Sequence, residues 1–141
     1  MRHEARSISQ LLTDNIVVRQ DAPVALTTAA NTLSAAGIIS GLFTINGGTA
    51  GAVTSTLVTA ALLDAALITT FGGFPVGYAV DFSIINISTV GAEDATVTTA
   101  AGWTLVGNMT VASNDAVSTV SFGIFRARKT ANSTFTLYRI A

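Results

Sequence analysis

The sequence contains no cysteine and a single histidine, and these two scarcities exclude several kinds of chemistry. Without cysteine the chain has no disulfide bond, no thiolate nucleophile and no cysteine metal site. His3 lies near the amino terminus, with no positioned partner that would complete a catalytic triad. Glu93, Asp94 and Asp115 fall in predicted turns, where acidic side chains are usually solvated and only rarely hold calcium. We therefore expect no enzyme activity, no catalytic residue, no metal and no cofactor.

Charged residues are also scarce, at 11% of the chain. A typical soluble domain has roughly 25%. No charged residue lies between Asp21 and Asp64. Two explanations are open: a neutral surface of Thr, Ser and Asn, or a surface that meets other subunits, since interface cores are depleted in charge. We favour the second, because few charges make a lone small domain hard to keep soluble.

Long apolar runs and a strong net charge are missing as well. The net charge of −1 predicts no general attraction to nucleic acid or to an anionic membrane. The mean hydropathy is +0.58, but a spanning helix needs about 20 mostly apolar residues in one run. Thr, Ser, Asn and paired glycines interrupt the apolar runs here, and no apolar core follows the first residues, as it would in a secretory signal. We expect no nucleic-acid partner, no membrane partner and no secretion by a signal peptide.

What is present divides the chain of 141 residues into an N-terminal arm, residues 1–22, and one domain, residues 23–141. The arm holds six of the fifteen charged residues, and Ile8, Leu11 and Leu12 have helical spacing. Either the arm orders against a partner or a neighbouring subunit, or it is a disordered terminus. In the first case the partner-binding residues are Arg2, Arg6, Ile8, Leu11, Leu12, Ile16, Val17, Val18 and Arg19.

The domain is organised around residues 77–88, where Tyr78, Val80, Phe82 and Ile84 alternate with smaller or polar residues. This period of two predicts a central strand with one face in a core. From Ile84 onward both sides are apolar, which is typical of a strand covered on both faces.

Short helices are predicted over residues 35–39 and 59–69. In the second helix Leu62, Leu63, Ala66 and Leu67 are expected to face the core, with Asp64 turned away.

Later in the chain, short alternating segments recur about every ten residues, separated by glycine and asparagine. Phe135 and Leu137 alternate in the last of them, and Val120, Phe122 and Ile124 share one face of the strand before it. This spacing predicts a mainly β fold, an antiparallel β-sandwich of jelly-roll type with one or two short helices and an N-terminal arm.

A candidate ligand-binding stripe is formed by late basic residues and two large aromatics. Arginine guanidinium groups bind carboxylates and phosphates, and aromatic rings stack on sugars. The simpler interpretation is an ion-paired rim strand with aromatics that pack in the core or in an interface, and we favour it. The residues concerned are Arg126, Arg128, Arg139, Trp103 and Tyr78.

Residues 77–140 resemble a β-rich module of virion structural proteins from tailed phages and large DNA viruses. The similar pieces are Gly-Tyr-Ala-Val-Asp-Phe-Ser-Ile-Ile-Asn-Ile-Ser, Gly-Trp-Thr-Leu-Val-Gly-Asn-Met-Thr-Val, Phe-Arg-Ala-Arg-Lys-Thr and Leu-Tyr-Arg-Ile. Residues 32–67 are similar to the segment that precedes this module. The resemblance implies a protein that decorates or cements a capsid, or forms a fibre or spike, commonly as a trimer.

We therefore expect a capsid decoration or cement subunit that is a homotrimer, binds the major capsid protein or another virion protein, and belongs to a virion assembled in the host cytoplasm. A fibre or spike component is the nearest variant. A carbohydrate-binding receptor-recognition module, using Trp103, Tyr78 and the arginine stripe, is an alternative of a different class.

Overall fold

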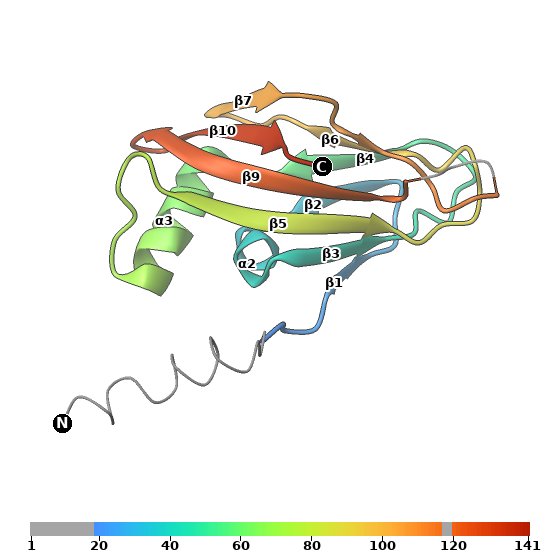
Figure 1. The fold of residues 1–141 in the computed structure, drawn as a ribbon, viewed down its shortest axis with the longest axis horizontal. Coiled ribbons are helices and arrows are strands. Elements are labelled where there is room, and N and C mark those ends of the chain that lie inside the picture. Colours follow the sequence, from blue (N-terminus) through green and yellow to red (C-terminus); the bar gives the residue numbers. More distant parts are fainter. Residues whose placement is uncertain (1–18, 117–119) are drawn as a thin grey trace.

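Two β-sheets share one hydrophobic core in the computed structural model, which describes residues 19–116 and 120–141 (Figure 1). The six-stranded sheet, sheet A, has the order β1 (Val24–Leu26), β3 (Leu42–Ile45), β5 (Ala79–Asn86), β9 (Phe122–Ala131), β10 (Thr134–Arg139) and β7 (Trp103–Val106). The four-stranded sheet, sheet B, has the order β2 (Ala30–Leu33), β4 (Val53–Leu57), β6 (Ala95–Thr98) and β8 (Thr110–Val111). The expected mainly β, two-sheet architecture is confirmed.

The sheets are mixed, so the expectation of a purely antiparallel sandwich is wrong. From β1 to β8 successive strands alternate between sheet A and sheet B. From β1 to β6, each strand that returns to a sheet runs in the direction of the preceding strand of that sheet. The pairs β1–β3, β3–β5, β2–β4 and β4–β6 are consequently parallel, as is β7–β10. Only β5–β9, β9–β10 and β6–β8 are antiparallel, so the jelly-roll connectivity is not confirmed.

Both predicted helices are confirmed: α2 spans Ala35–Ser40 and α3 spans Ala60–Phe71. The side-chain oxygens of Ser34 and Thr59 accept hydrogen bonds from the first-turn amides, as N-caps do. Each helix ends at a glycine with positive φ, 94° at Gly41 and 74° at Gly72, where a side chain would be strained.

The winding places the two helices at one end of the sandwich. Each helix connects a strand of sheet B to the next strand of sheet A, whereas connections 27–29, 46–52 and 87–94 run from sheet A to sheet B at the other end. We call α2, α3 and residues 72–78 the helical end, and residues 46–52, 87–94 and 112–116 the loop end (Figure 1).

The core lies between the sheets and is lined by alternate residues of nearly every strand. Phe82 is 1% exposed, as the sequence predicts, and its ring stacks on Phe125 with centroids 5.4 Å apart. The largest fully buried side chains are Phe43, Phe82, Phe125, Phe135, Leu33, Ile38, Ile45, Leu57, Leu63, Leu67, Ile84 and Leu137.

The central position of β5 is confirmed, but only its inner face is covered. Ile85 is exposed on the outer face of sheet A, so the expectation of cover on both faces is wrong. Phe122 and Ile124 share that outer face, since they pair with Ile85 and Ser83. Tyr78 precedes β5 and is 59% exposed, so it is not part of the core.

The predicted core face of α3 is also partly wrong. Leu63 and Leu67 are buried, but Leu62 is 60% exposed and Asp64 is buried. Asp64 points inward because Lys129 of β9 meets it there, with 2.7 Å between Nζ and Oδ1. Hydrophobic periodicity cannot show a pairing with a strand 65 residues away.

Threonine rows cover the outer face of sheet B. The register aligns Thr54 with Thr96 and Thr110 on neighbouring strands. It also aligns Thr56 with Thr98, whose hydroxyl oxygens are 3.0 Å apart. This face carries no charged side chain in β2, β4, β6 or β8, so a neutral surface explains part of the low charge content.

Candidate functional site

The predicted arm lies almost wholly outside the described residues, which begin at Arg19. Residues 19–22 belong to no helix or strand, and Arg19 is exposed with its guanidinium 3.5 Å from Asp21. Gln20 donates a hydrogen bond from Nε2 to the carbonyl oxygen of Ser40, 2.9 Å away at the end of α2. The chain therefore joins the body beside α2.

Two of the stripe arginines lie together on the outer face of sheet A. Arg126 holds Asp81 through two parallel hydrogen bonds of 2.8 Å, across the β5–β9 pair. The hydrogen bond from Arg126 lowers the pKa of the Asp81 carboxyl, and the same bond raises the pKa of Arg126. Arg128 is exposed two residues further along β9. This is the ion-paired arrangement that the sequence favoured over a ligand-binding stripe.

Arg139 lies on the opposite face of sheet A from Arg126. It pairs with Phe125 in the strand register, and its guanidinium sits 5.2 Å from the centroid of that ring. The guanidinium donates to the carbonyl oxygens of Thr110 at 2.9 Å and of Phe122 at 3.1 Å, and burial lowers its pKa. Arg139 thus fastens sheet A to the end of β8, and the structure does not bring it together with Arg126 and Arg128.

Of the two aromatics of the predicted stripe, Trp103 packs away from the arginine pair, whereas Tyr78 directly precedes Ala79, which pairs with Arg128 in the strand register. Trp103 donates from Nε1 to the carbonyl oxygen of Val58 at 2.7 Å and packs on Phe135, with centroids 5.4 Å apart. Its ring therefore ties β7 to the junction of β4 and α3. Tyr78 rests edge-on against Phe74, with centroids 6.0 Å apart, at the helical end.

The loop end holds a buried polar cluster around Glu93, which the sequence had placed in a solvated turn. The carboxylate accepts hydrogen bonds from the Ser88 hydroxyl and from the backbone amides of Thr49 and Ala50, at 2.7 and 2.8 Å. The hydrogen bond from Ser88, followed by that from Ala50, lowers the pKa of Glu93. No sequence signal distinguished Glu93 from Asp94, because the amides that satisfy it come from another loop.

Asn86 extends the same cluster into the core. Its amide donates to the carbonyl oxygens of Glu93 at 2.8 Å and Val111 at 3.2 Å, and its oxygen accepts from the amide of Ser88 at 3.1 Å. A cleft of about 570 Å³ opens beside the cluster, and the Glu93 and Asn86 contacts tie loop 87–94 to loop 46–52 and to strands β5 and β8. The cluster is therefore a device that holds the loop end together.

The helical end combines few charged residues with exposed apolar side chains. In the interval from residue 22 to residue 80, all of it described, the one charged residue is Asp64, and it is buried. Large apolar side chains are nonetheless exposed there. They are Leu62, Ile68, Phe71, Val76 and Tyr78.

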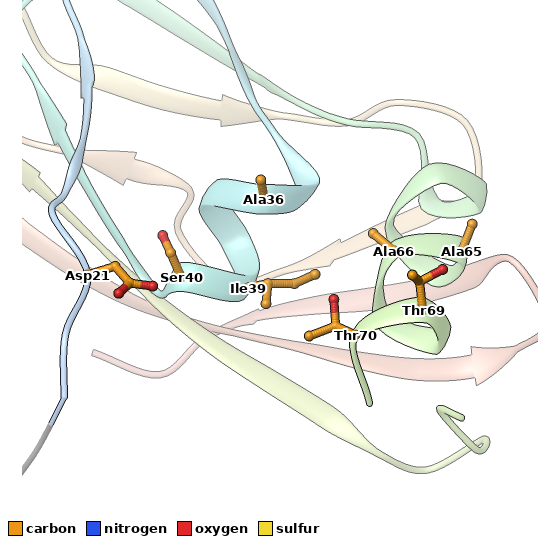
Figure 2. Close-up of a pocket in the computed structure, with 8 residues that line it drawn as sticks. All are labelled: Asp21, Ala36, Ile39, Ser40, Ala65, Ala66, Thr69 and Thr70. Atoms are coloured by element: carbon orange, nitrogen blue, oxygen red, sulfur yellow. The ribbon is translucent and has the colours of Figure 1, made fainter. Parts of the chain in front are cut away.

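A groove of about 530 Å³ runs between the two helices at this end (Figure 2). Ala36 and Ile39 from α2 and Ala66 and Thr69 from α3 line it, so most of the lining side chains are small. Asp21, from the segment that precedes β1, stands at its rim. An open groove with uncharged walls and one charge at its rim is typical of a site that contacts another polypeptide.

The described ranges, 19–116 and 120–141, contain no group of three or more His, Cys, Asp or Glu that could hold a metal ion. Within the same ranges no helix is both long and apolar enough to cross a membrane. Comparison of the whole chain with protein-family models, with curated proteins and with solved structures finds no match.

Proposed function

We propose that the chain is a structural virion protein, a capsid decoration or cement subunit that binds the lattice of the major capsid protein. The observation that carries this proposal is the helical end, where Leu62, Phe71 and Val76 are exposed and the interval from residue 22 to residue 80 has no exposed charged side chain. Exposed apolar clusters of this kind mark protein–protein contacts. The resemblance of residues 77–140 to virion modules supplies the class of partner.

The proposed assembly is a homotrimer. Subunit contacts through the helical end would remove its large apolar side chains from water, which is the main driving force of association. This expectation depends on exposed side chains and not on a jelly-roll connectivity. Light scattering at micromolar concentration should give three times the 14.4 kDa mass of one chain, and a monomer of 14.4 kDa would contradict it.

The charged part of the arm is proposed as the attachment to the capsid. Arg2, Arg6 and Arg19 supply guanidinium groups that can pair with carboxylates on a lattice. The test is to mix the protein with undecorated capsids of the virus that encodes it and to sediment the mixture. Full-length protein should co-sediment, and failure to do so would refute the virion role.

Two variants separate the arm from the body in this experiment. A chain without residues 1–20 should remain folded and oligomeric but should no longer co-sediment. The variant Arg2→Gln/Arg6→Gln tests the charges alone, and Asn132→Gln, at the exposed β9–β10 turn, is the matched surface control. Full co-sedimentation of the shortened chain would show that the body carries the docking surface.

A fibre or spike component is the nearest variant. Electron micrographs of the virion separate the two roles, because a decoration subunit should lie on the capsid and a fibre or spike component on the tail. The carbohydrate-binding alternative receives less support, because Trp103 is used in packing and Arg139 faces away from Arg126. A glycan array decides this point, since a decoration protein should bind no sugar selectively.

A further inference from the structure

The groove between α2 and α3 is open in the described structure, although its lining is suited to a helix. Ala36 on α2 and Ala65 and Ala66 on α3 have small side chains, so the backbone of a third helix can approach both helices closely. Ile39 adds an apolar contact, and the groove carries no charge except Asp21 at its rim. A groove of this kind accepts the apolar face of an amphipathic helix, whose anchors recur at i, i+3, i+4 and beyond.

The chain itself delivers such a segment to the rim of the groove. β1 is parallel to β3, and β3 directly follows α2, so the residues before β1 lie at the helical end. Gln20 is hydrogen-bonded to Ser40 at the end of α2, and Asp21 lines the groove (Figure 2). Eighteen residues precede the described part in the sequence, and the described part starts beside the groove.

The sequence of those residues has the required period. Ile8, Leu11 and Leu12 are spaced i, i+3 and i+4, and Ile16 follows at i+8. The residues in between are all polar: Ser9, Gln10, Thr13, Asp14 and Asn15. On a helix the first four fall opposite the apolar set, which gives one apolar and one polar face, and Asn15 is the one polar residue on the apolar side.

We propose that residues 8–16 pack as a helix into the α2–α3 groove of their own chain, with Ile8, Leu11, Leu12 and Ile16 facing α2 and α3. Residues 17–19 connect the segment to the anchored Gln20, and three extended residues span about 10 Å. A connection that short gives the segment an effective concentration in the millimolar range, which favours its own groove over that of another copy.

The proposal goes beyond the virion role and does not require it. It assigns the apolar half of the arm to the body, and it leaves Arg2, Glu4 and Arg6 projecting from the helical end. The charged residues proposed for attachment would then start from a fixed point on the body rather than from the end of a long tether. Less conformational entropy would be lost when they bind.

Disulfide trapping tests the packing directly, because the natural sequence has no cysteine to interfere. Leu12→Cys and Ala66→Cys are introduced together, and the free protein is oxidised without any capsid. A disulfide forms readily only when the two Cα atoms lie within about 7 Å of each other. The expected product is a cross-link within one chain. On a non-reducing gel it should migrate faster than the reduced monomer, with no band at the position of a dimer.

Two matched controls define the face and the site. Thr13→Cys with Ala66→Cys moves the first thiol to the polar face, and Leu12→Cys with Thr96→Cys moves the second to the outer face of sheet B. Neither pair should cross-link. A dimer band from Leu12→Cys/Ala66→Cys would assign the groove to a neighbouring copy and overturn the own-chain packing. No cross-link from this pair would overturn the docking.

Hydrogen exchange keeps the proposal testable if the cysteine variants fold poorly. In the unaltered chain the amides of residues 8–16 should be protected, and deletion of residues 1–18 should speed exchange in α2 and α3. Exchange in residues 8–16 at the rate of an unfolded peptide would refute the proposal. Either result concerns free protein, so it is separate from the outcome of the capsid sedimentation.

Discussion

The two ends of the sandwich each bury a carboxylate, and they satisfy it in different ways. At the helical end Asp64 meets the ammonium of Lys129 and also accepts the amide of Ser133 at 2.9 Å. At the loop end Glu93 has no cationic partner among the hydrogen bonds that hold it, which come from one hydroxyl and two backbone amides. One end relies on a second charge and the other on backbone dipoles.

The difference follows from what surrounds each carboxylate. Backbone amides of α3 and β9 are committed to their own helix and sheet, so a backbone donor reaches Asp64 only from the β9–β10 turn, at Ser133, and the ammonium of Lys129 binds the other carboxylate oxygen. The loop end consists of turns whose amides have no regular partners, and Glu93 collects them. A buried carboxylate therefore secures elements at the helical end and joins loops at the loop end.

Loss of Lys129 should give the largest effect, because it leaves Asp64 buried without its counter-charge. Breaking such a pair from one side typically costs about 3–5 kcal/mol. Lys129→Met should therefore lower the free energy of unfolding by that amount in urea titrations, with Arg128→Met as the exposed control on the same strand. Adding Asp64→Asn to Lys129→Met should recover part of the loss. If Lys129→Met matches Arg128→Met, the helical end does not depend on the pair.

Removal of the Asn86 amide is the corresponding test at the loop end. Asn86→Ala leaves the carbonyl oxygens of Glu93 and Val111 without their donor, and an unsatisfied buried group costs about 1–3 kcal/mol. Urea titration should show this loss, whereas Asn46→Ala, at an exposed position of the same end, should be near neutral. A cost as large as that of Lys129→Met would mean that the two ends are equally sensitive.

The sequence predicted local features of the fold well and long-range pairings poorly. Helix α3 is encoded locally, because Thr59, an alanine-rich run and Gly72 are cap and propensity signals. The parallel pairing of β3 with β5 was missed, because alternation has period two in parallel and antiparallel strands alike.

The same limit applies to the candidate sites. Asp64 and Glu93 were both expected to be solvated, since their partners lie 65 and up to 44 residues away. The Asp81–Arg126 pair could be predicted in kind from the sequence, because an exposed arginine on a strand usually pairs with a carboxylate on the neighbouring strand. The helical end was indicated only indirectly, by the long interval without charge after Asp21.

Acid should affect the loop end through Glu93. Its pKa is lowered in the folded state from the ordinary value of 4.5, so its contribution to stability is present above that value and is lost as the pH falls through the folded-state pKa. Glu93→Gln keeps an acceptor for the amides of Thr49 and Ala50 but cannot titrate. The difference in melting temperature between wild type and variant should shrink from pH 7 to pH 3. Asp21→Asn is the control for an exposed charge, and a constant difference would contradict the assignment.

The smallest effect is expected from a third carboxylate, Asp81, which lies on the outer face of sheet A between the two ends. Its side chain and that of Arg126 are 46% and 50% exposed, and water screens an ion pair of this kind. Asp81→Asn should cost no more than about 1 kcal/mol, and the cost should decrease in high salt. A double-mutant cycle with Arg126→Gln isolates the pair from other effects of either change.

The lowered pKa of Asp81 makes its contribution to stability disappear in acid, as for Glu93. A coupling above about 2 kcal/mol that salt does not reduce would indicate a desolvated pair. Since the pair is open to solvent in a single chain, another subunit would then cover sheet A, and contacts between copies would extend beyond the helical end.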